Sequence, residues 1–341
     1  MAYTTIDNPT AYFDTTLWST QDTSIDTLNF QPDWVWLKSR SNADTHVAFD
    51  SVRGVNKRLS PSETSQESTT SDELTAFNSD GFTLGTGDNV NRASQTMVAW
   101  SWLSGGSASS NGDGSITSSV SANTTAGFSI ATYTGTGSSA TIGHGLSSVP
   151  QMIIVKRRDS ADGWFIYHHS IGNGKYLRLE TTDAEASSSN LWGGTDPTSS
   201  VFTVNNNSTN GSSRTFVAYC FAEKKGYSKF GSYTGNGNAD GTFVYTGFKP
   251  AFVILKRTDA TNNWHMVDNK RDTFNPTDLQ LYPNLNNSEY AETDGMDFLS
   301  NGFKIRESAT WINASGGTYI YMAFAEAPFA TSGTKAAGTA R

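Results

Sequence analysis

Residues 30–38 read Phe-Gln-Pro-Asp-Trp-Val-Trp-Leu-Lys, and the same pattern returns as Val-Pro-Gln-Met-Ile-Ile-Val-Lys at 149–156 and as Phe-Lys-Pro-Ala-Phe-Val-Ile-Leu-Lys at 248–256. In each copy a proline and one further residue precede four apolar residues and a lysine. Four consecutive apolar residues lack the alternation of a half-exposed strand, which indicates a strand covered on both faces. We expect one face to lie in a sandwich core and the other against a neighbouring repeat or subunit.

Two further blocks follow each copy in a fixed order. The first is Ser-Asp-Gly-Phe-Thr-Leu at 79–84, Ser-Val-Phe-Thr-Val at 200–204 and Ser-Asn-Gly-Phe-Lys-Ile at 300–305; the second is Val-Ala-Trp-Ser-Trp at 98–102, Val-Ala-Tyr-Cys-Phe at 217–221 and Tyr-Met-Ala-Phe-Ala-Glu at 321–326. The lysine of the central stretch precedes the phenylalanine of the first block by 44, 46 and 47 residues. Such constant spacing predicts three tandem repeats, at 1–104, 127–225 and 226–329.

The fold class predicted from these patterns is all-β, with three tandem antiparallel β-sandwich repeats of jelly-roll or lectin-like type. Glycine-rich turns such as Gly-Thr-Gly at 135–137 and Gly-Asn-Gly at 235–237 predict a hairpin at the start of the second and third repeats. Residues 105–126 are mostly Gly, Ser, Asn and Thr and are interpreted as a linker. Residues 330–341 are expected to be a C-terminal tail.

Composition and charge exclude several classes of protein. Only 16% of the residues are charged, against about 25% in a typical soluble domain, which argues against a helical bundle. The net charge of −8 predicts that the chain binds no nucleic acid and is not drawn to anionic membranes. No apolar stretch is long enough to cross a membrane, and the first residues do not resemble a signal peptide. Cys220 is the one cysteine, so no intramolecular disulfide can form.

Candidate catalytic and metal sites have simpler structural interpretations. No nucleophile elbow, phosphate loop or zinc-protease motif is present, so we expect no catalytic residue, no enzymatic activity and no cofactor. His168 and His169 are adjacent on a predicted strand and should point to opposite faces, which disfavours a shared metal ion. The oxygen-rich stretch 236–241 could hold calcium, but a hairpin turn explains it more simply.

The tryptophans fall into two groups. Trp34, Trp36, Trp100 and Trp102 recur as apolar residues in the other repeats and are interpreted as core, although a sugar-stacking platform is an alternative. Trp18, Trp192 and Trp311 lie near turns without clear recurrence, and they are our candidates for contact with a ligand or partner.

The basic residues that end the central strand also recur. Lys38, Lys156 and Lys256 are each followed by arginine and by acidic residues, which favours structural ion pairs or strand gatekeepers.

Several of these motifs together resemble an uncharacterised domain of virion proteins from marine tailed bacteriophages. The resemblance is carried by the stretches 30–40, 49–54, 78–85, 98–102, 119–128, 226–231 and 321–326. It implies a phage structural protein, often described as a tail fibre or virion protein, and it brings no catalytic residues. One arginine in these stretches is not shared by all three repeats, since Arg53 and Arg271 correspond to Ile171.

The function expected from the sequence is that of a non-enzymatic virion surface protein, in a fibre, spike or tail-tip component that contributes to host attachment. Its expected partners are other virion proteins, further copies of itself in a homo-oligomer with a trimer favoured, and a host surface glycan. Its expected location is the virion, after assembly in the host cytoplasm. Two alternatives stay open, namely a capsid decoration protein, and a glycan-binding lectin or polysaccharide depolymerase.

Overall fold

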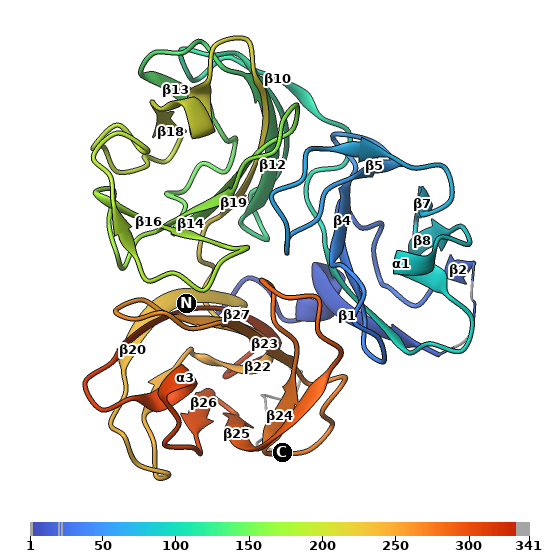
Figure 1. Ribbon diagram of the computed structural model, residues 1–341, viewed down its shortest axis with the longest axis vertical. Helices are drawn as coiled ribbons and strands as arrows, with labels where there is room; N and C mark the ends of the chain where they lie inside the picture. Colours follow the sequence, from blue (N-terminus) through green and yellow to red (C-terminus); the bar gives the residue numbers. More distant parts are fainter. Residues whose placement is uncertain (1–2, 20, 22, 332–341) are drawn as a thin grey trace.

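A computed structural model describes residues 3–19, 21 and 23–331 of this protein as an all-β chain folded into three units around a common centre (Figure 1). The helices in this part of the chain are short, namely η1 (Pro9–Ala11), α1 (Asp88–Asn91), α2 (Asn207–Asn210) and α3 (Thr310–Asn313). None of the helices in the described residues is long and apolar enough to cross a membrane.

Each unit contains four antiparallel strands in the same spatial order. These are β1 (Phe13–Trp18), β9 (Met97–Trp102), β3 (Trp34–Ser39) and β4 (Val47–Asp50) in unit 1; β12 (Phe128–Thr134), β19 (Thr215–Phe221), β14 (Met152–Arg157) and β15 (Trp164–His168) in unit 2; and β20 (Ser228–Thr234), β27 (Thr318–Pro328), β22 (Phe248–Arg257) and β23 (Trp264–Asp268) in unit 3. The two strands in the middle of each set come from the first and last of the recurring sequence blocks.

A second, smaller sheet belongs to each unit and gives it a sandwich-like form. The orders are β2 (Ser24–Ile25), β8 (Gly81–Leu84), β7 (Leu74–Asn78) in unit 1; β13 (Ala140–Gly143), β18 (Val201–Val204) in unit 2; and β21 (Phe243–Tyr245), β26 (Gly302–Ile305), β25 (Tyr290–Leu299), β24 (Thr277–Gln280) in unit 3. The hairpin expected at the start of units 2 and 3 is wrong. In unit 2, β12 pairs with β11 and β19 whereas β13 pairs with β18, and in unit 3, β20 pairs with β27 whereas β21 pairs with β26. Gly137 and Gly237, with φ of 82° and 71°, turn the chain from the large sheet to the small one.

The expectation that the central strand is covered on both faces is confirmed. In β3, Val35 and Leu37 point into the core of unit 1, while Trp34 and Trp36 point into a cluster shared by all three units. The strands β14 and β22 divide their side chains in the same way. Because side chains alternate along a strand, each central strand joins its own sandwich core to the centre of the molecule.

Residues 105–126, expected to be a linker, are folded onto unit 2. They form β10 (Ser109–Asn111) and β11 (Ser118–Asn123), and β11 pairs with the edge of β12 from Ser119 to Asn123. With β16 (Lys175–Arg178) and β17 (Ala186–Ser187) at the other edge, the sheet of unit 2 has eight strands. A further pair, β5 (Lys57–Arg58) and β6 (Ser68–Thr69), lies in unit 1. Most of the expected tail, from residue 332 onward, falls outside the described residues.

Candidate functional site

The centre of the molecule is an aromatic cluster to which every unit contributes. Trp34 of unit 1 stacks on Tyr219 of unit 2 with ring centroids 4.5 Å apart, and Phe13 of unit 1 stacks on Phe324 of unit 3 at 4.9 Å. Trp34, Trp36, Trp100 and Trp102 are all fully buried here. Their core assignment is therefore correct, and the core they form joins the three units to one another.

Three segments, which we call straps, carry each unit onto the next: residues 60–67, 178–185 and 282–289. The strap of unit 1 rests on unit 2, that of unit 2 on unit 3, and that of unit 3 on unit 1. The amide of the last strap residue donates in each case to a carbonyl of the next unit, from Glu67 to Arg158 at 2.8 Å, from Glu185 to Thr258 at 2.8 Å and from Glu289 to Arg40 at 2.7 Å.

The indole N–H groups of two buried tryptophans donate hydrogen bonds to two of the straps. The Nε1 of Trp164 donates to the carbonyls of Ser60 and Glu63, at 3.0 and 3.1 Å, and the Nε1 of Trp264 donates to the carbonyl of Arg178 at 2.9 Å. His46 takes the equivalent place beneath the third strap. Burial, together with the charge of Lys38, holds the pKa of His46 well below its ordinary value, so the ring is neutral.

Two of the recurring lysines secure straps, and the arginines beside them form the ion pairs that the sequence suggested, Arg157 with Asp159 at 2.7 Å and Arg257 with Asp259 at 2.9 Å. The ammonium of Lys156 donates to the carbonyls of Thr64, Arg157 and Asp162, and that of Lys256 donates to Thr182 and Arg257. The ammonium of Lys38 donates to carbonyls of its own unit. Burial lowers the pKa of each of the three lysines to about 8.

Two buried ion pairs lie beside the central cluster. Arg53 binds Asp50 at 2.5 Å, Arg271 binds Asp268 at 2.6 Å, and all four side chains are inaccessible to solvent. Each carboxylate also accepts a hydrogen bond from the next unit, Asp50 from the Tyr219 hydroxyl at 2.7 Å and Asp268 from Trp100 Nε1 at 3.0 Å. A buried carboxylate needs such partners, because an unpaired one carries a large desolvation penalty.

Unit 2 replaces this ion pair by a neutral arrangement. His168 and Ile171 stand where the other units have aspartate and arginine. Burial, and the neighbouring His169, lower the pKa of His168 to about 3, so its ring is neutral at ordinary pH. The two histidine rings lie 5.1 Å apart, contrary to the expectation of opposite faces, and their Nε2 atoms face the separate carbonyls of Tyr321 and Phe230.

The strap glutamates are the residues that the sequence analysis missed. Glu67 lies between two guanidinium groups, accepting from Arg53 of its own unit at 3.1 Å and from Arg158 of the next unit at 2.8 Å. Burial alone would raise the pKa of Glu67, but these arginines hold it below its ordinary value. Glu289 lies in the same way between Arg271 and Arg40. The signal was present in the spacing, since the three glutamates follow the strand lysines by 29, 29 and 33 residues.

The three candidate tryptophans are buried in the cores of separate units. Trp18, Trp192 and Trp311 are 9%, 2% and 9% exposed, and the structure does not bring them together. Trp192 donates through Nε1 to the carbonyl of Lys175, and Trp311 stacks on His265 at 4.2 Å. None of the three offers an open ring face. Their role in ligand contact is not tested by the structure and stays a prediction.

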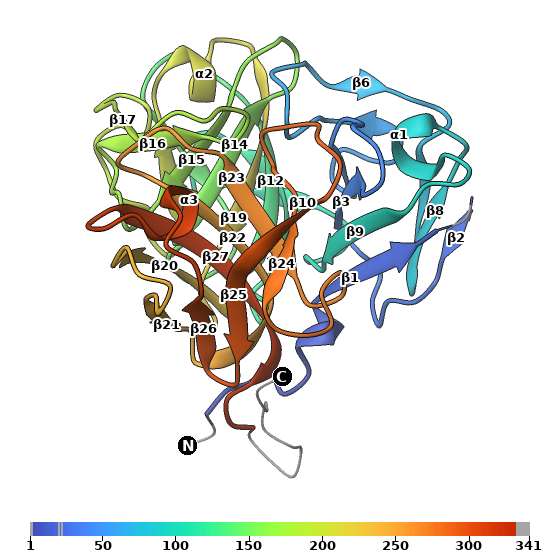
Figure 2. The same cartoon turned by 60° about the horizontal axis from the view of Figure 1, so that its bottom comes forward.

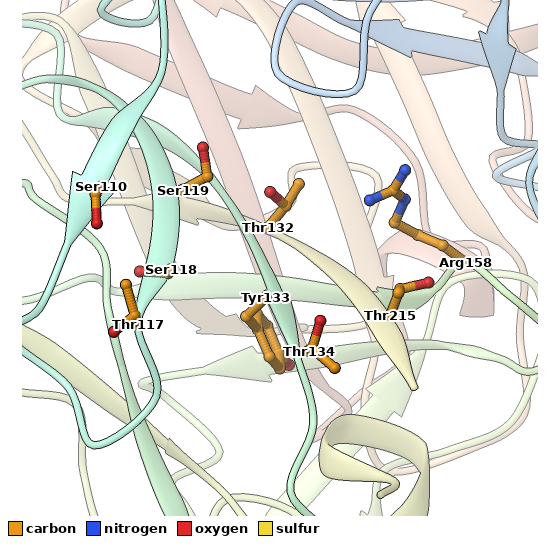
Figure 3. A pocket seen from close by; sticks show the side chains of 9 residues that line it. All are labelled: Ser110, Thr117, Ser118, Ser119, Thr132, Tyr133, Thr134, Arg158 and Thr215. Atoms are coloured by element: carbon orange, nitrogen blue, oxygen red, sulfur yellow. The ribbon is translucent and has the colours of Figure 1, made fainter. Parts of the chain in front are cut away.

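A shallow polar pocket of about 390 Å³ lies where β10 and β11 meet β12 (Figure 3). Hydroxyl groups of serine and threonine dominate its lining, and Arg158 stands at one side. The one aromatic residue of the lining, Tyr133, is buried and donates its hydroxyl to the carbonyl of Thr209. The pocket can form hydrogen bonds but offers no ring on which a sugar could stack.

The oxygen-rich stretch 236–241 uses its polar groups within the protein. The Asn236 side chain accepts from the Asn238 amide and from Asn313 Nδ2, both at 3.0 Å, and Asp240 pairs with Lys304 at 2.8 Å. Across residues 3–19, 21 and 23–331, no three His, Cys, Asp or Glu side chains gather in an arrangement that could hold a metal ion.

An exposed aromatic cluster is formed by residues near both ends of the described chain, which lie at the same end of the molecule (Figure 2). We call it the terminal aromatic cluster and define it as Tyr3, Phe243, Tyr245 and Phe329. Tyr3 approaches the Tyr245 hydroxyl at 3.4 Å and meets the edge of Phe329 with centroids 6.3 Å apart. Phe243 and Tyr245 lie on the same face of edge strand β21 and are 43% and 54% exposed, so this surface is suited to a partner with apolar or sugar groups.

These features define the class of protein as an all-β chain whose three sandwich-like units are closed into one body by straps and a shared aromatic centre. The chain belongs to a family described as a domain of unknown function, DUF7483, whose match covers residues 8–328. The match includes all three units and their junctions, so the family unit is the whole body. No curated protein and no solved structure matches the chain.

Proposed function

We propose that this protein is a non-enzymatic structural protein of a phage virion, displayed on the particle surface as a fibre, spike or tail-tip component that contributes to host attachment. The resemblance of its recurring motifs to virion proteins supports the phage context. The observation that carries the structural role is that the buried charges and rings of each unit are used to hold the next unit. These contacts join the three units into one rigid body, and rigidity suits a protein displayed on the surface of a particle.

The terminal aromatic cluster is the proposed attachment surface for other virion proteins. Both ends of the described chain lie there, and Lys225 lies over the Tyr3 ring at 4.4 Å, which leaves a mixed apolar and basic patch. Exposed aromatic side chains on an edge strand are typical of protein contact surfaces. Attachment through this end would leave the opposite end of the body facing the surroundings.

The finer features of the fold and assembly belong to the same proposal. We propose that the three units are jelly-roll or lectin-like repeats, which their identical strand order supports. We also propose self-association into a homo-oligomer, with a trimer favoured. The apolar outer face of the central strands no longer argues for it, because neighbouring units cover that face. Light scattering on the purified protein tests this, and a monomer at micromolar concentration would contradict it.

The decisive experiment locates the chain on intact particles. Antibody raised against the purified protein is applied to virions of the phage that encodes it, and the label is imaged by electron microscopy. Label on the tail or its fibres supports the proposal. Label on the head favours the alternative of a capsid decoration protein, and absence of the chain from purified particles by mass spectrometry contradicts a virion role.

A second candidate function, glycan binding, is favoured by the exposed rings of the same cluster. Tyr245→Ala should abolish binding on a glycan array, whereas Tyr290→Ala, which removes a ring with 55% exposure elsewhere on unit 3, should not. A wild-type protein that binds no glycan, and that leaves host polysaccharide intact on incubation, excludes both the lectin and the depolymerase.

A further inference from the structure

The junction between units 2 and 3 differs from the other two at the strap glutamate. In the two sister junctions this glutamate is held by two guanidinium groups, as described for Glu67 and Glu289. Glu185 occupies the equivalent place, because its amide donates to the carbonyl of Thr258 at 2.8 Å as the other two do to Arg158 and Arg40. The backbone geometry of the junction is therefore kept.

Both arginines are missing at this third junction. Ile171 stands in place of Arg53 and Arg271, and Thr258 stands in place of Arg158 and Arg40. The loss inside unit 2 is compensated, since His168 replaces the aspartate that would otherwise be left buried without a cation. The loss of the second arginine is not compensated in this way, because the acid it would meet, Glu185, is retained.

A pocket of about 350 Å³ opens at this place, between residues of β16 and of β20. Its lining combines Glu185 and Lys175 of unit 2 with the hydroxyl groups of Ser232, Thr258 and Thr318 of unit 3. The volume lies at the small end of the range of about 300–1,000 Å³ for ligand sites. It suits a small polar group better than a large apolar one.

The only charged partner of Glu185 in the described residues is Lys175, whose side chain is 43% exposed. An exposed ammonium on a flexible stem is a weak partner, because its ion pair is screened and its side chain loses entropy when it is held. A guanidinium forms two parallel hydrogen bonds with one carboxylate, and is the stronger partner. An incoming guanidinium can thus displace Lys175 toward solvent.

We propose that this pocket binds a guanidinium group, supplied by a free guanidino compound or by an arginine side chain of a partner protein, which takes the place that Arg158 and Arg40 fill in the sister junctions. The ligand forms with Glu185 the same carboxylate–guanidinium pair that Glu67 forms with Arg158 and that Glu289 forms with Arg40. The hydroxyl groups of the lining accept the remaining N–H groups. The site is independent of the proposed virion role.

The test titrates the full-length protein with methylguanidinium and with N-acetyl-arginine amide by calorimetry. For a ligand of a few heavy atoms we expect a dissociation constant on the order of 1 mM. N-acetyl-citrulline amide, the neutral isostere of N-acetyl-arginine amide, and N-acetyl-lysine amide should bind at least about tenfold more weakly. Tighter binding of an arginine-containing peptide than of the free compounds identifies a partner protein as the source; the reverse identifies a small molecule.

Four variants link the binding to this pocket. Glu185→Gln should weaken binding at least about tenfold, while Asp183→Asn, which removes the same charge from an exposed position on the strap, should not change it. Thr258→Arg supplies the arginine that Arg158 and Arg40 provide in the sister junctions, and it should abolish binding and raise the melting temperature. Lys175→Met removes the competitor and should tighten binding by about two- to fivefold.

Three results would overturn the proposal. The first is no saturable binding of either guanidinium probe to the wild-type protein below about 50 mM, far above the expected dissociation constant. The second is equal binding of N-acetyl-citrulline amide, and the third is binding that survives Glu185→Gln. If Thr258→Arg fails to fold, the Glu185→Gln and Asp183→Asn pair still decides the question.

Discussion

The shared aromatic centre makes one substitution especially informative. Trp34 is 1% exposed and packs on Trp102 of its own unit and on Tyr219 of unit 2, with both centroid distances 4.5 Å. A buried tryptophan removes about 150–250 Å² from water, which at about 25 cal/mol per Å² corresponds to about 4–6 kcal/mol. Measured Trp→Ala changes in cores are about 3–5 kcal/mol. We therefore expect Trp34→Ala to lower the free energy of unfolding by about 4 kcal/mol.

The assay is urea unfolding, followed by hydrogen exchange of the amides of β19 in unit 2 and of β9 in unit 1. Because the side chain serves two units, protection of both strands should fall together. Trp34→Phe is the matched control: it keeps a stacking ring and removes an Nε1 that has no hydrogen-bond partner in the described residues, so it should lose no more than about 1.5 kcal/mol. If Trp34→Ala lowers protection in β9 but leaves β19 unchanged, the units are independent and the reasoning fails.

Three further predictions follow from the buried charges and from the folded linker. Arg53→Met leaves its carboxylate partner buried without a cation and should cost about 3–5 kcal/mol in urea unfolding, whereas Arg40→Met, at a partly exposed pair, should cost at most about 1 kcal/mol. The pKa of His168 is about 3 in the folded protein and ordinarily 6.5, so only the unfolded chain takes up this proton as the pH falls below 6.5, and stability drops. Between pH 7 and 5 this residue should remove about 2 kcal/mol, and the asparagine variant at this position should lose about that much less. Val120→Asp, at a buried site of β11, should cost about 3 kcal/mol or more in thermal unfolding, while Ser119→Asp, exposed on the same strand, should change stability by about 0.5 kcal/mol or less.

Each of these has a contradicting result. Equal losses for the two arginine variants would mean that burial does not set the strength of these ion pairs. An unchanged pH slope in the His168 variant would mean that the ring is protonated in the folded protein. Tolerance of aspartate at Val120 would mean that residues 105–126 behave as the linker their composition predicts.

The sequence predicted most about the elements whose residues recur. The central strands, their double burial and the core role of Trp34 and Trp100 were readable because neighbouring residues on a strand face opposite sides. The sequence led to a wrong prediction where that prediction rested on composition alone. Residues 105–126 are mostly polar, yet Ile116 and Val120 are buried in the core of unit 2 and hold this segment against it.

The candidate site was less predictable, because its contacts join distant parts of the chain. Nothing near Glu67 in the sequence indicates that Arg158 lies on it, since 91 residues separate the pair. The same holds for Tyr219 and Asp50, which are 169 residues apart. The missing arginine at Ile171 was visible in the sequence, but its meaning depended on seeing what Arg53 and Arg271 bind.

By itself the sequence determined an all-β chain with three copies of one pattern, because the periodicity of apolar residues and the spacing of the blocks are local properties. The tertiary structure decided that the neighbour covering each central strand is another unit of the same chain. It also decided that Glu67 and Glu289 pair with arginines of the next unit, whereas Glu185 in the third junction lines a pocket. Such matters depend on which surfaces meet in space, and burial there sets the strength of every charge and hydrogen bond.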